Sequence, residues 1–405
     1  MIKRIKEICD FVSRGTTPDY IDEGKNKVMN QATFSKGWLD ENNIRYTSKT
    51  NNNAIIKKGD LLMASTGGGV LGKVLFFDSD DNEFYADSHV TILRNSKGKN
   101  LMKYLYYHFY LRYNEINATM VKGSTNQTEL QRNYLLSYEL DIPSLEVQKK
   151  MVNYLDTKLS EIDIQVSILT SKRDAYLRLK KSIINHAVTK GLNPDVKMKS
   201  SGIEWIGMIP EHWEVKRMKE IYTERKEVSV TGKEDLLSVS EYYGVARRKD
   251  KISSDDEFES RADSLVGYKI CKTNDLVINI MLAWKTGLGV SDYDGIVSPA
   301  YAVYKGKKIV SHYYHYLLRS GMYVTEFKRH SKGIIDSRLR LYNDRFNNIT
   351  AIYPPFNEQQ AIASYLDDKC SKIDTIVTNL EKQISKYADL KRSLIDEVIT
   401  GKRAV

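Results

Sequence analysis

Apolar residues recur at alternating spacings of four and three in two stretches of the chain, residues 145–189 and 356–400. This is the a/d pattern of a coiled-coil heptad, and neither stretch contains a proline or glycine. The first stretch places Leu155, Leu159, Ile162, Val166, Leu169, Tyr176, Ile183 and Ala187 on this seam, and the second places Leu366, Cys370, Ile373, Val377, Leu380, Ile384, Tyr387, Leu394 and Val398 there. The pattern predicts two long helices that form an intramolecular coiled coil.

Three basic residues, Arg173, Lys180 and Lys391, interrupt the apolar seam. Polar residues at seam positions can fix the register of a coiled coil at some cost in stability. Gly191 and Pro194 follow the first stretch in the usual order of helix stop signals, so we expect the first helix to end there.

The two stretches are copies of each other. With an offset of 211 and no gap, Pro143 matches Pro354, Gln148 matches Gln359, and the Tyr-Leu-Asp triplet at 154–156 matches that at 365–367. Further matches are Ile-Asp at 162–163 and 373–374, Leu-Lys at 179–180 and 390–391, and Thr189 with Thr400. A repeat of this length indicates tandem duplication.

The segment before each helix has the pattern of a mixed α/β domain. In the first half, apolar runs at 61–63, 73–77, 90–93 and 138–142 predict strands, 100–112 predicts a tyrosine-rich helix, and 122–127 predicts a polar loop. In the second half, 216–221 echoes 3–8, 272–277 echoes 57–62, a helix is predicted at 311–327, and a basic loop at 332–340 stands where 122–127 stood. The loops differ most between the two halves, so we expect the two loops to contact different targets.

The predicted fold class is therefore α/β (mixed α+β), with two similar globular domains separated by two long antiparallel helices in an internal pseudo-twofold duplication. The predicted segments are a first domain at 1–143, the first helix at 144–192, a connector at 193–212, a second domain at 213–354 and the second helix at 355–405.

Composition adds modest constraints. The 405 residues carry a net charge of +10, which is compatible with a polyanionic partner. Cys9, Cys271 and Cys370 lie far apart without a CxxC pair, so we expect free thiols in a reducing cytoplasm. No signal-peptide pattern and no apolar run of membrane-spanning length is present, so neither export nor a membrane is expected.

Two motifs look catalytic and are interpreted structurally. Residues 67–73 fit GxxxxGK, but Val74 stands where a P-loop needs Ser or Thr, and a strand rather than a helix is predicted to follow. Residues 353–356 (Tyr-Pro-Pro-Phe) resemble an amino-methyltransferase motif, but Tyr353 cannot hold an exocyclic amine. We expect the first to be a hairpin turn and the second to start the second long helix.

Further motifs resemble one known family. Segments 189–194 (Thr-Lys-Gly-Leu-Asn-Pro), 201–207 (Ser-Gly-Ile-Glu-Trp-Ile-Gly) and 209–215 (Ile-Pro-Glu-His-Trp-Glu-Val) resemble the central region of Type I restriction–modification specificity (S) subunits. Segment 354–359 resembles the start of the family's distal helix, whereas the first copy has Val147 where Glu358 stands. This departure slightly weakens the expectation of an identical partner contact at both sites.

The resemblance implies a function. Each globular domain would be a target-recognition domain that reads one half of a bipartite double-stranded DNA sequence. The helices would dock two methyltransferase subunits that bind S-adenosylmethionine and methylate adenine, and two restriction subunits, where present, would use ATP and Mg. The chain itself would be a non-catalytic, cytoplasmic specificity subunit without a cofactor or metal of its own.

Candidate DNA contacts follow from the loops and their charge, because phosphate contacts come from cations and amides and base contacts from loop side chains. For the first domain they are Lys122, Ser124, Thr125, Asn126 and Gln127, with Arg14, Thr16 and Lys73 as backbone contacts. For the second they are Lys332, Ser337, Arg338 and Arg340, with Lys285, Arg247, Arg248 and Lys249 in addition.

Other classes of protein stay open at this point. An enzyme would need a cofactor loop or carboxylate cluster that the pattern does not supply. A scaffold that uses its coiled coil alone would leave the two diverged domains and the basic surplus unexplained. A coiled-coil DNA-binding scaffold outside restriction–modification is the alternative function. Binding to a specific bipartite duplex separates these alternatives.

Overall fold

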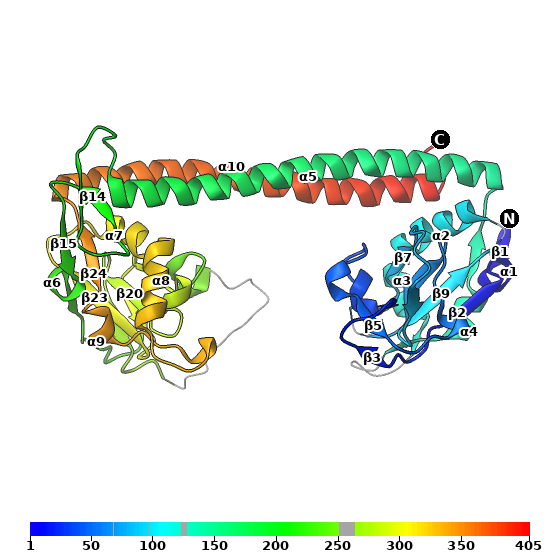
Figure 1. Ribbon diagram of the computed structural model, residues 1–405, viewed down its shortest axis with the longest axis horizontal. Coiled ribbons are helices and arrows are strands. Elements are labelled where there is room, and N and C mark those ends of the chain that lie inside the picture. Colours follow the sequence, from blue (N-terminus) through cyan, green and yellow to red (C-terminus); the bar gives the residue numbers. More distant parts are fainter. Residues whose placement is uncertain (68, 97, 123–127, 251–263) are drawn as a thin grey trace. The chain divides into compact units, whose positions relative to one another are not determined.

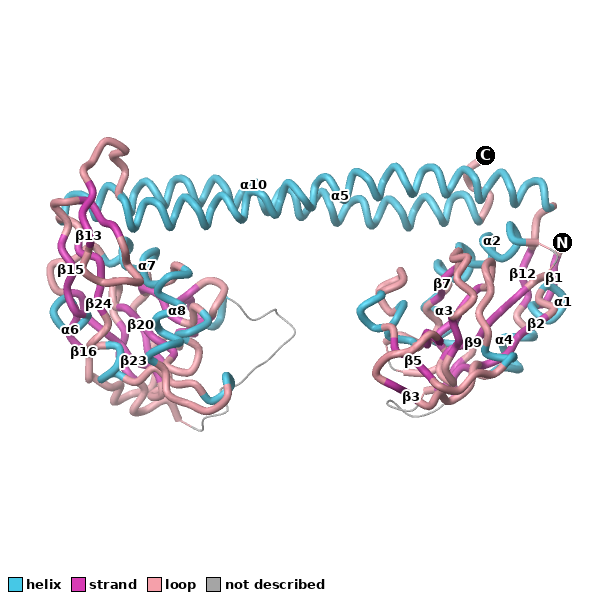
Figure 2. The backbone as a smooth tube through the Cα atoms, in the orientation of Figure 1, coloured by secondary structure: helices cyan, strands magenta, loops and turns pink. Residues whose placement is uncertain are grey.

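The two predicted long helices are present as α5 (Leu145–Lys190) and α10 (Phe356–Ile399) (Figures 1 and 2). The structure is a computed structural model that describes residues 1–405 except 68, 97, 123–127 and 251–263. By contact the chain forms two units, residues 1–170 with 382–405, and residues 171–381. Each unit thus contains one globular part and a portion of both helices, and the five-segment division made from the sequence stays a prediction.

Within each unit the heptad seam is buried between the helices. Leu155 and Ile162 share a core with Leu394 in the first unit, and Ala187 shares one with Leu366 in the second. Interhelix ion pairs join Asp163 to Lys391 and Lys180 to Asp374, so that later residues of α5 meet earlier residues of α10. This order makes the helices antiparallel, and it confirms the predicted coiled coil.

The predicted stop of the first helix is also confirmed. Gly191 follows α5 with a positive φ of 78°, and its N–H donates to the carbonyl of Ala187 at 3.1 Å. Within the described part of the chain, no helix combines the length and apolar character needed to cross a membrane.

The globular part of the first unit contains two four-stranded sheets, ordered β2-β9-β6-β7 and β3-β5-β4-β8. Its strands are β1 (Ile2–Arg4), β2 (Phe11–Arg14), β3 (Tyr20–Ile21), β4 (Asn26–Met29), β5 (Arg45–Thr47), β6 (Leu61–Ala64), β7 (Val74–Phe76), β8 (Phe84–Ala86), β9 (Val90–Arg94), β10 (Val121–Lys122), β11 (Glu129–Leu130) and β12 (Glu139–Asp141). Its helices are α1 (Ile5–Ile8), α2 (Lys99–Leu111), α3 (Tyr113–Thr119) and α4 (Arg132–Ser137), with short 3-10 turns η1 (Gln31–Phe34), η2 (Glu41–Asn43) and η3 (Asn52–Ala54).

The globular part of the second unit has one four-stranded sheet, ordered β16-β23-β20-β21, and several paired strands. Its strands are β13 (Met198–Ser200), β14 (Met208–Pro210), β15 (Glu214–Arg217), β16 (Tyr222–Glu224), β17 (Leu237–Ser240), β18 (Gly244–Arg247), β19 (Lys269–Cys271), β20 (Leu276–Asn279), β21 (Leu288–Val290), β22 (Gly295–Val297), β23 (Tyr301–Gly306) and β24 (Thr350–Tyr353). Its helices are α6 (Met218–Ile221), α7 (Ser311–Leu318), α8 (Gly321–His330) and α9 (Asn343–Phe346), with η4 (Arg248–Asp250), η5 (Ala283–Lys285) and η6 (Asp336–Arg338).

The two globular parts share one topology. The sheet β2-β9-β6-β7 corresponds strand by strand to β16-β23-β20-β21, and the pair β1-β12 corresponds to β15-β24. In both, a one-turn helix follows the first strand and is capped alike: the N–H of Arg4 donates to Glu7 Oε2 (2.7 Å) and that of Arg217 to Glu220 Oε2 (2.5 Å). The structure therefore confirms the duplication and the mixed α/β fold class.

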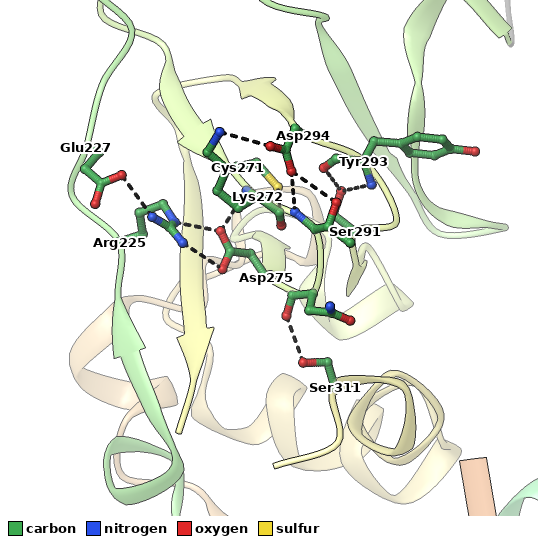
Figure 3. Close-up of polar contacts among 11 residues, drawn as sticks. Arg225, Glu227, Cys271, Lys272, Asp275, Ser291, Tyr293, Asp294 and Ser311 are labelled. Carbon is green, nitrogen blue, oxygen red and sulfur yellow. Dashed lines mark hydrogen bonds and ion pairs between the residues drawn. The ribbon is translucent and has the colours of Figure 1, made fainter. Parts of the chain in front are cut away.

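A buried aspartate before the third strand of each sheet makes the same turn in both units. The N–H of Lys57 donates to Asp60 Oδ2 at 2.7 Å, and that of Lys272 to Asp275 Oδ2 at 2.8 Å. Arg225 Nε and Nη2 donate to the Asp275 carboxylate at 2.6 and 3.2 Å (Figure 3). Such pairing satisfies a carboxylate that burial would otherwise penalise, so this turn anchors the strand that leads to the candidate site.

Candidate nucleic-acid interface

The two predicted recognition loops leave their domains at equivalent points. After α3, β10 pairs with β11, and after α8, Lys332 and Arg340 exchange two backbone hydrogen bonds of 2.9 Å. The returning strand is tied back in the same way: the N–H of Leu130 donates to Ser65 O, just after β6, and that of Leu341 to Ile280 O, just after β20. The residues preceding these donors, Glu129 and Arg340, therefore occupy matching positions.

The tip of the first loop carries most of the side chains that we predicted to read bases. Ser124, Thr125, Asn126 and Gln127 lie outside the described residues, and so does the side chain of Lys122, whose backbone belongs to β10. Their assignment as DNA contacts stays a prediction.

At the foot of this first hairpin lies a polar hollow of about 600 Å³. It is lined by Arg14, Gly15, Gln31, Thr66, Gly67, Ser88, His89, Thr128 and Glu129. A β-bridge between Thr66 and Glu129 joins the hairpin to the end of β6 and brings the hairpin to the hollow. Only Arg14 of these residues was a candidate from the sequence; the others come from separate strands and turns and carry no local motif.

Hydrogen bonds order three side chains of this hollow. Thr66 Oγ1 donates to Gln31 Oε1 at 3.1 Å and lies 2.7 Å from His89 Nδ1. Because the amide oxygen can only accept, the Thr66 hydroxyl proton is used there, and His89 Nδ1 must carry the proton that it donates to Thr66. The backbone N–H of His89 donates to Asp87 Oδ1 at 2.8 Å. The pKa of the Asp87 carboxyl is raised, mainly because the group is buried.

Arg14 faces a carboxylate in the same hollow. Its Nη1 donates to Glu129 Oε1, and the two side chains are 34% and 48% exposed. The buried Nε of Arg14 has no hydrogen-bond partner among the described residues. The guanidinium is thus held from one side and keeps donor capacity on another.

Thr16 and Lys73, the other two residues of the first domain that we predicted to contact the DNA backbone, lie in different places. The N–H of Thr16 donates to Ala86 O at 3.2 Å, beside the hollow-lining Gly15. Lys73 Nζ instead donates to Ser35 O at 2.6 Å and lines a separate cavity of about 340 Å³ with Tyr113 and Arg392. Lys73 thus does not line the hollow that contains Arg14. It directly precedes β7, at the far end of the glycine turn from the hollow-lining Gly67.

The basic loop of the second domain lies fully within the described residues. Ser337 and Arg338 are exposed in η6, and Lys332 is exposed at the base of the hairpin. Arg340 Nη1 donates to the carbonyls of Leu339 (2.8 Å) and Ser337 (3.3 Å), so its guanidinium also braces the loop. Within the described residues, the Arg338 side chain makes no hydrogen bond or ion pair, so its guanidinium is freer than that of Arg340.

An aromatic ring joins Lys285 to this loop. Lys285 Nζ and Lys328 Nζ lie 4.9 and 5.1 Å from the centroid of the Trp284 ring. Lys328 also pairs with Asp336 of η6 at 3.0 Å. Cation–π contacts of this kind gather positive charge on an aromatic face. Trp284 and Lys328 were not predicted, although a tryptophan next to a lysine in a turn was a usable signal.

The three-residue basic run of the second domain lies elsewhere, in β18 and η4. Arg247 Nε is 3.4 Å from Asp235 Oδ2, and its guanidinium sits 4.7 Å from the Tyr293 ring centroid. The N–H of Arg248 donates to Leu236 O, and the side chain of Lys249 lies outside the described residues. Their assignment as DNA contacts stays a prediction.

The two motifs that look catalytic have structural roles. Gly67, Gly69 and Gly72 have positive φ angles in the connection between β6 and β7, and a strand follows at Val74, as predicted. Tyr353 ends β24 under the ammonium of Lys216, 3.7 Å from its ring centroid, and α10 begins at Phe356. A strand after Lys73 offers no helix N-terminus to a phosphate.

The cysteines are free and buried, as predicted, and burial raises the pKa of Cys9 and Cys271 to about 12. Across the described ranges, no group of three or more His, Cys, Asp or Glu side chains is arranged to hold a metal ion.

Comparisons with known proteins agree with this architecture. A family model, the Type I restriction modification DNA specificity domain, matches residues 1–170. A candidate specificity subunit of the type I restriction enzyme MjaX from Methanocaldococcus jannaschii is 24% identical over 226 residues, 53% of this chain and 50% of that protein. The MjaVIII specificity subunit of the same organism is 22% identical over 380 residues, 88% of this chain and 82% of its length. The chain therefore spans about half of the first relative and most of the second.

Solved structures share the fold over nearly the whole chain. A chain from a study of complex assembly and conformational transition of the type I R-M system superposes with a TM-score of 0.70 at 12% identity, covering 98% of this chain and 97% of that one. The HsdS subunit from Thermoanaerobacter tengcongensis superposes with a TM-score of 0.50 at 12% identity, covering 100% and 97%.

The fold and the matches together define a duplicated protein in which two α/β domains each carry a matched hairpin and are followed by a long helix. Residues 1–170 match the Type I restriction modification DNA specificity domain, and over most of its length the chain is similar to a Type I restriction enzyme specificity subunit.

Proposed function

We propose that this specificity subunit reads a bipartite duplex DNA, one half with each globular domain. The observation that carries the proposal is the pair of hairpins that leave both domains at equivalent points but bear different residues, as at Glu129 and Arg340. Equivalent placement with different chemistry is what two half-sites of different sequence require. The net charge of +10 supports a polyanionic partner.

The long helices would dock two methyltransferase subunits and set the distance between the half-sites. The methyltransferase subunits would bind S-adenosylmethionine and methylate adenine, and two restriction subunits, where present, would supply ATP- and Mg-dependent chemistry. The chain would contribute specificity alone and act in the cytoplasm, where the DNA lies. The alternative, a coiled-coil DNA-binding scaffold outside restriction–modification, is disfavoured because the matching family model and the similar proteins are those of Type I specificity subunits.

The test begins with co-purification, which we expect to yield an adenine methyltransferase, and continues with reconstitution of that enzyme with this chain. The complex is incubated with S-adenosylmethionine and a randomised duplex library, and methylated adenines are mapped. Methylation of one two-part sequence with a constant gap is expected. Methylation without a two-part preference, or equal methylation by the methyltransferase alone, would refute the proposal.

A further inference from the structure

The polar hollow at the foot of the first hairpin has the chemistry of a base-reading site. We propose that Gln31 and Arg14 read base edges of one half-site from this hollow, with Gln31 positioned by Thr66 and Arg14 positioned by Glu129. This inference rests on the proposed function and assigns residues to it. It also moves Arg14 from the phosphate contacts expected from the sequence to the base contacts.

Gln31 is held in one orientation while its amide nitrogen stays available. Its oxygen accepts from Thr66 Oγ1, and its Nε2 has no hydrogen-bond partner among the described residues. The amide packs over Gly67: a Cβ there would lie 2.8 Å from Nε2 and 3.0 Å from Oε1. Gly67 also has a φ of 95°, which favours glycine. The backbone thus makes room for this one side chain.

An ordered amide of this kind suits adenine. A glutamine reads adenine by donating to N7 and accepting from N6, and its carbonyl oxygen has a second lone pair beside the one used by Thr66. Thr66 Oγ1 donates to the amide oxygen, so the amide nitrogen is the end that remains free to donate. Thr66 is therefore a positioning residue, and Gln31 is the residue that contacts the base.

Arg14 suits guanine better than phosphate. The carboxylate of Glu129 already neutralises the guanidinium, and a half-exposed negative charge beside it disfavours a second anion. A neutral base edge with two acceptors, O6 and N7 of guanine, meets no such repulsion. Glu129 engages only Nη1, and Nη2 makes no hydrogen bond among the described residues, so it can donate to one of these acceptors.

The second domain lacks this arrangement, so the effect should be confined to one half-site. At the position of Glu129 it carries Arg340, which braces its own loop through the carbonyls of Ser337 and Leu339. Counting from the matched turn aspartates Asp60 and Asp275, the position of Thr66 carries Met281, which cannot order an amide.

The experiment uses the reconstituted complex and the randomised library, with methylated sequences counted for each variant. Gln31→Ala and Arg14→Ala are each expected to reduce discrimination at one base pair of one half by about tenfold or more, without changing preference in the other half. Thr66→Val should reproduce the Gln31→Ala effect, whereas Thr66→Ser should retain the wild-type preference because it keeps the hydroxyl. Lys58→Ala, which removes an exposed pair with Asp80 elsewhere on this domain, is the control.

Each outcome of this experiment either supports or contradicts the proposed base contacts. If Arg14→Ala prevents folding, Glu129→Gln keeps the shape and removes the charge, and it should relax preference at the same base pair. The inference would be overturned if Gln31→Ala kept the wild-type base preference at every position and either Arg14→Ala or Glu129→Gln did so too. Equal losses of base preference in both half-sites would also overturn it. If the wild-type complex itself shows no two-part preference, the proposed function fails instead.

Discussion

Lys180 of α5 donates to both carboxylate oxygens of Asp374 of α10, at 2.6 and 2.7 Å. The pair recurs with the helices exchanged, because Lys391 of α10 lies 2.5 Å from Asp163 of α5. Both members are related by the sequence offset of 211, so the repeat is also a repeat of contacts. The lysines that interrupt the apolar seam are thereby paired across it and favour one register of the antiparallel helices.

Reversing one of these pairs tests the register role. Lys180→Asp places two carboxylates opposite each other, and we expect it to lower the free energy of unfolding by about 1 kcal/mol at low salt. The exchange Lys180→Asp with Asp374→Lys should restore most of that loss. Urea unfolding measures both, and Lys181→Asp at an exposed neighbouring position is the control. No recovery in the exchanged pair would show that Lys180 and Asp374 are not coupled.

The difference between the two helix starts has a local cause. Glu358 accepts from Trp213 Nε1 at 3.0 Å and lies 2.6 Å from His212 Nε2. His212 is the last residue of the predicted connector and Trp213 is the first residue of the predicted second domain. Val147, at the matching position, is exposed. Glu358 therefore holds the connector onto α10.

Exchanging these two helix-start residues tests the connector contact. Glu358→Val leaves the indole N–H of the fully buried Trp213 without its acceptor, and we expect a loss of about 1–3 kcal/mol in unfolding free energy. Val147→Glu, at the exposed equivalent site, should stay within about 0.5 kcal/mol of wild type. Denaturant unfolding followed by tryptophan fluorescence compares them. Equal effects of both substitutions would contradict the assignment.

The basic loop predicts a graded effect of its two arginines. Arg338→Ala should reduce discrimination at one half-site by roughly 1–3 kcal/mol, because a free guanidinium can read guanine. Arg340→Ala should also loosen the loop, since its Nη1 bonds two loop carbonyls. Methylation mapping separates the two, with melting temperature as a control for folding. Equal loss of preference at both half-sites, or uniform weakening without changed preference, would count against the assignment.

Helix length should set the gap between the half-sites. Inserting one heptad at the same level of α5 and α10 keeps the seam and adds about 10 Å, at 1.5 Å per residue. At about 3.4 Å per base pair, the preferred gap should grow by roughly three base pairs. Affinity should still fall, because the added twist turns the second half-site around the duplex. A folded variant that binds its methyltransferase and keeps the original gap would refute this role.

Acid should destabilise the second unit through His315. Burial, with help from Arg319 and His312, lowers the pKa of its imidazole from 6.5 to about 4. Between these values the unfolded chain binds a proton that the folded chain does not, so stability is fully present above pH 6.5 and falls as pH drops toward 4. By pH 5 the loss should be about 2 kcal/mol at most.

His315→Asn isolates this effect. An amide oxygen can still accept from the N–H of Val290, which donates to Nδ1 at 3.3 Å in the wild type. Denaturant unfolding at pH 7, 6 and 5 should show a smaller decline with acid in the variant than in the wild type. Parallel declines in both proteins would show that His315 does not carry the proton uptake.

Local and repeated features of this protein could be predicted from its sequence. The heptad seam predicted the buried positions of α5 and α10, since a 3.5-residue period determines which side of a helix is apolar whatever surrounds it. The strand after Lys73 followed from a local apolar run, and the matched loops followed from alignment of the chain with itself.

Side-chain groupings between distant segments were decided only by the tertiary structure. Gln31, Thr66, His89 and Glu129 line one hollow because the sheets and the first hairpin bring their strand ends together. Lys73, chosen for its charge, turns to a backbone carbonyl instead. Alternation along a strand specifies which face is buried but not which strands become neighbours or in what register, and these determine which side chains meet.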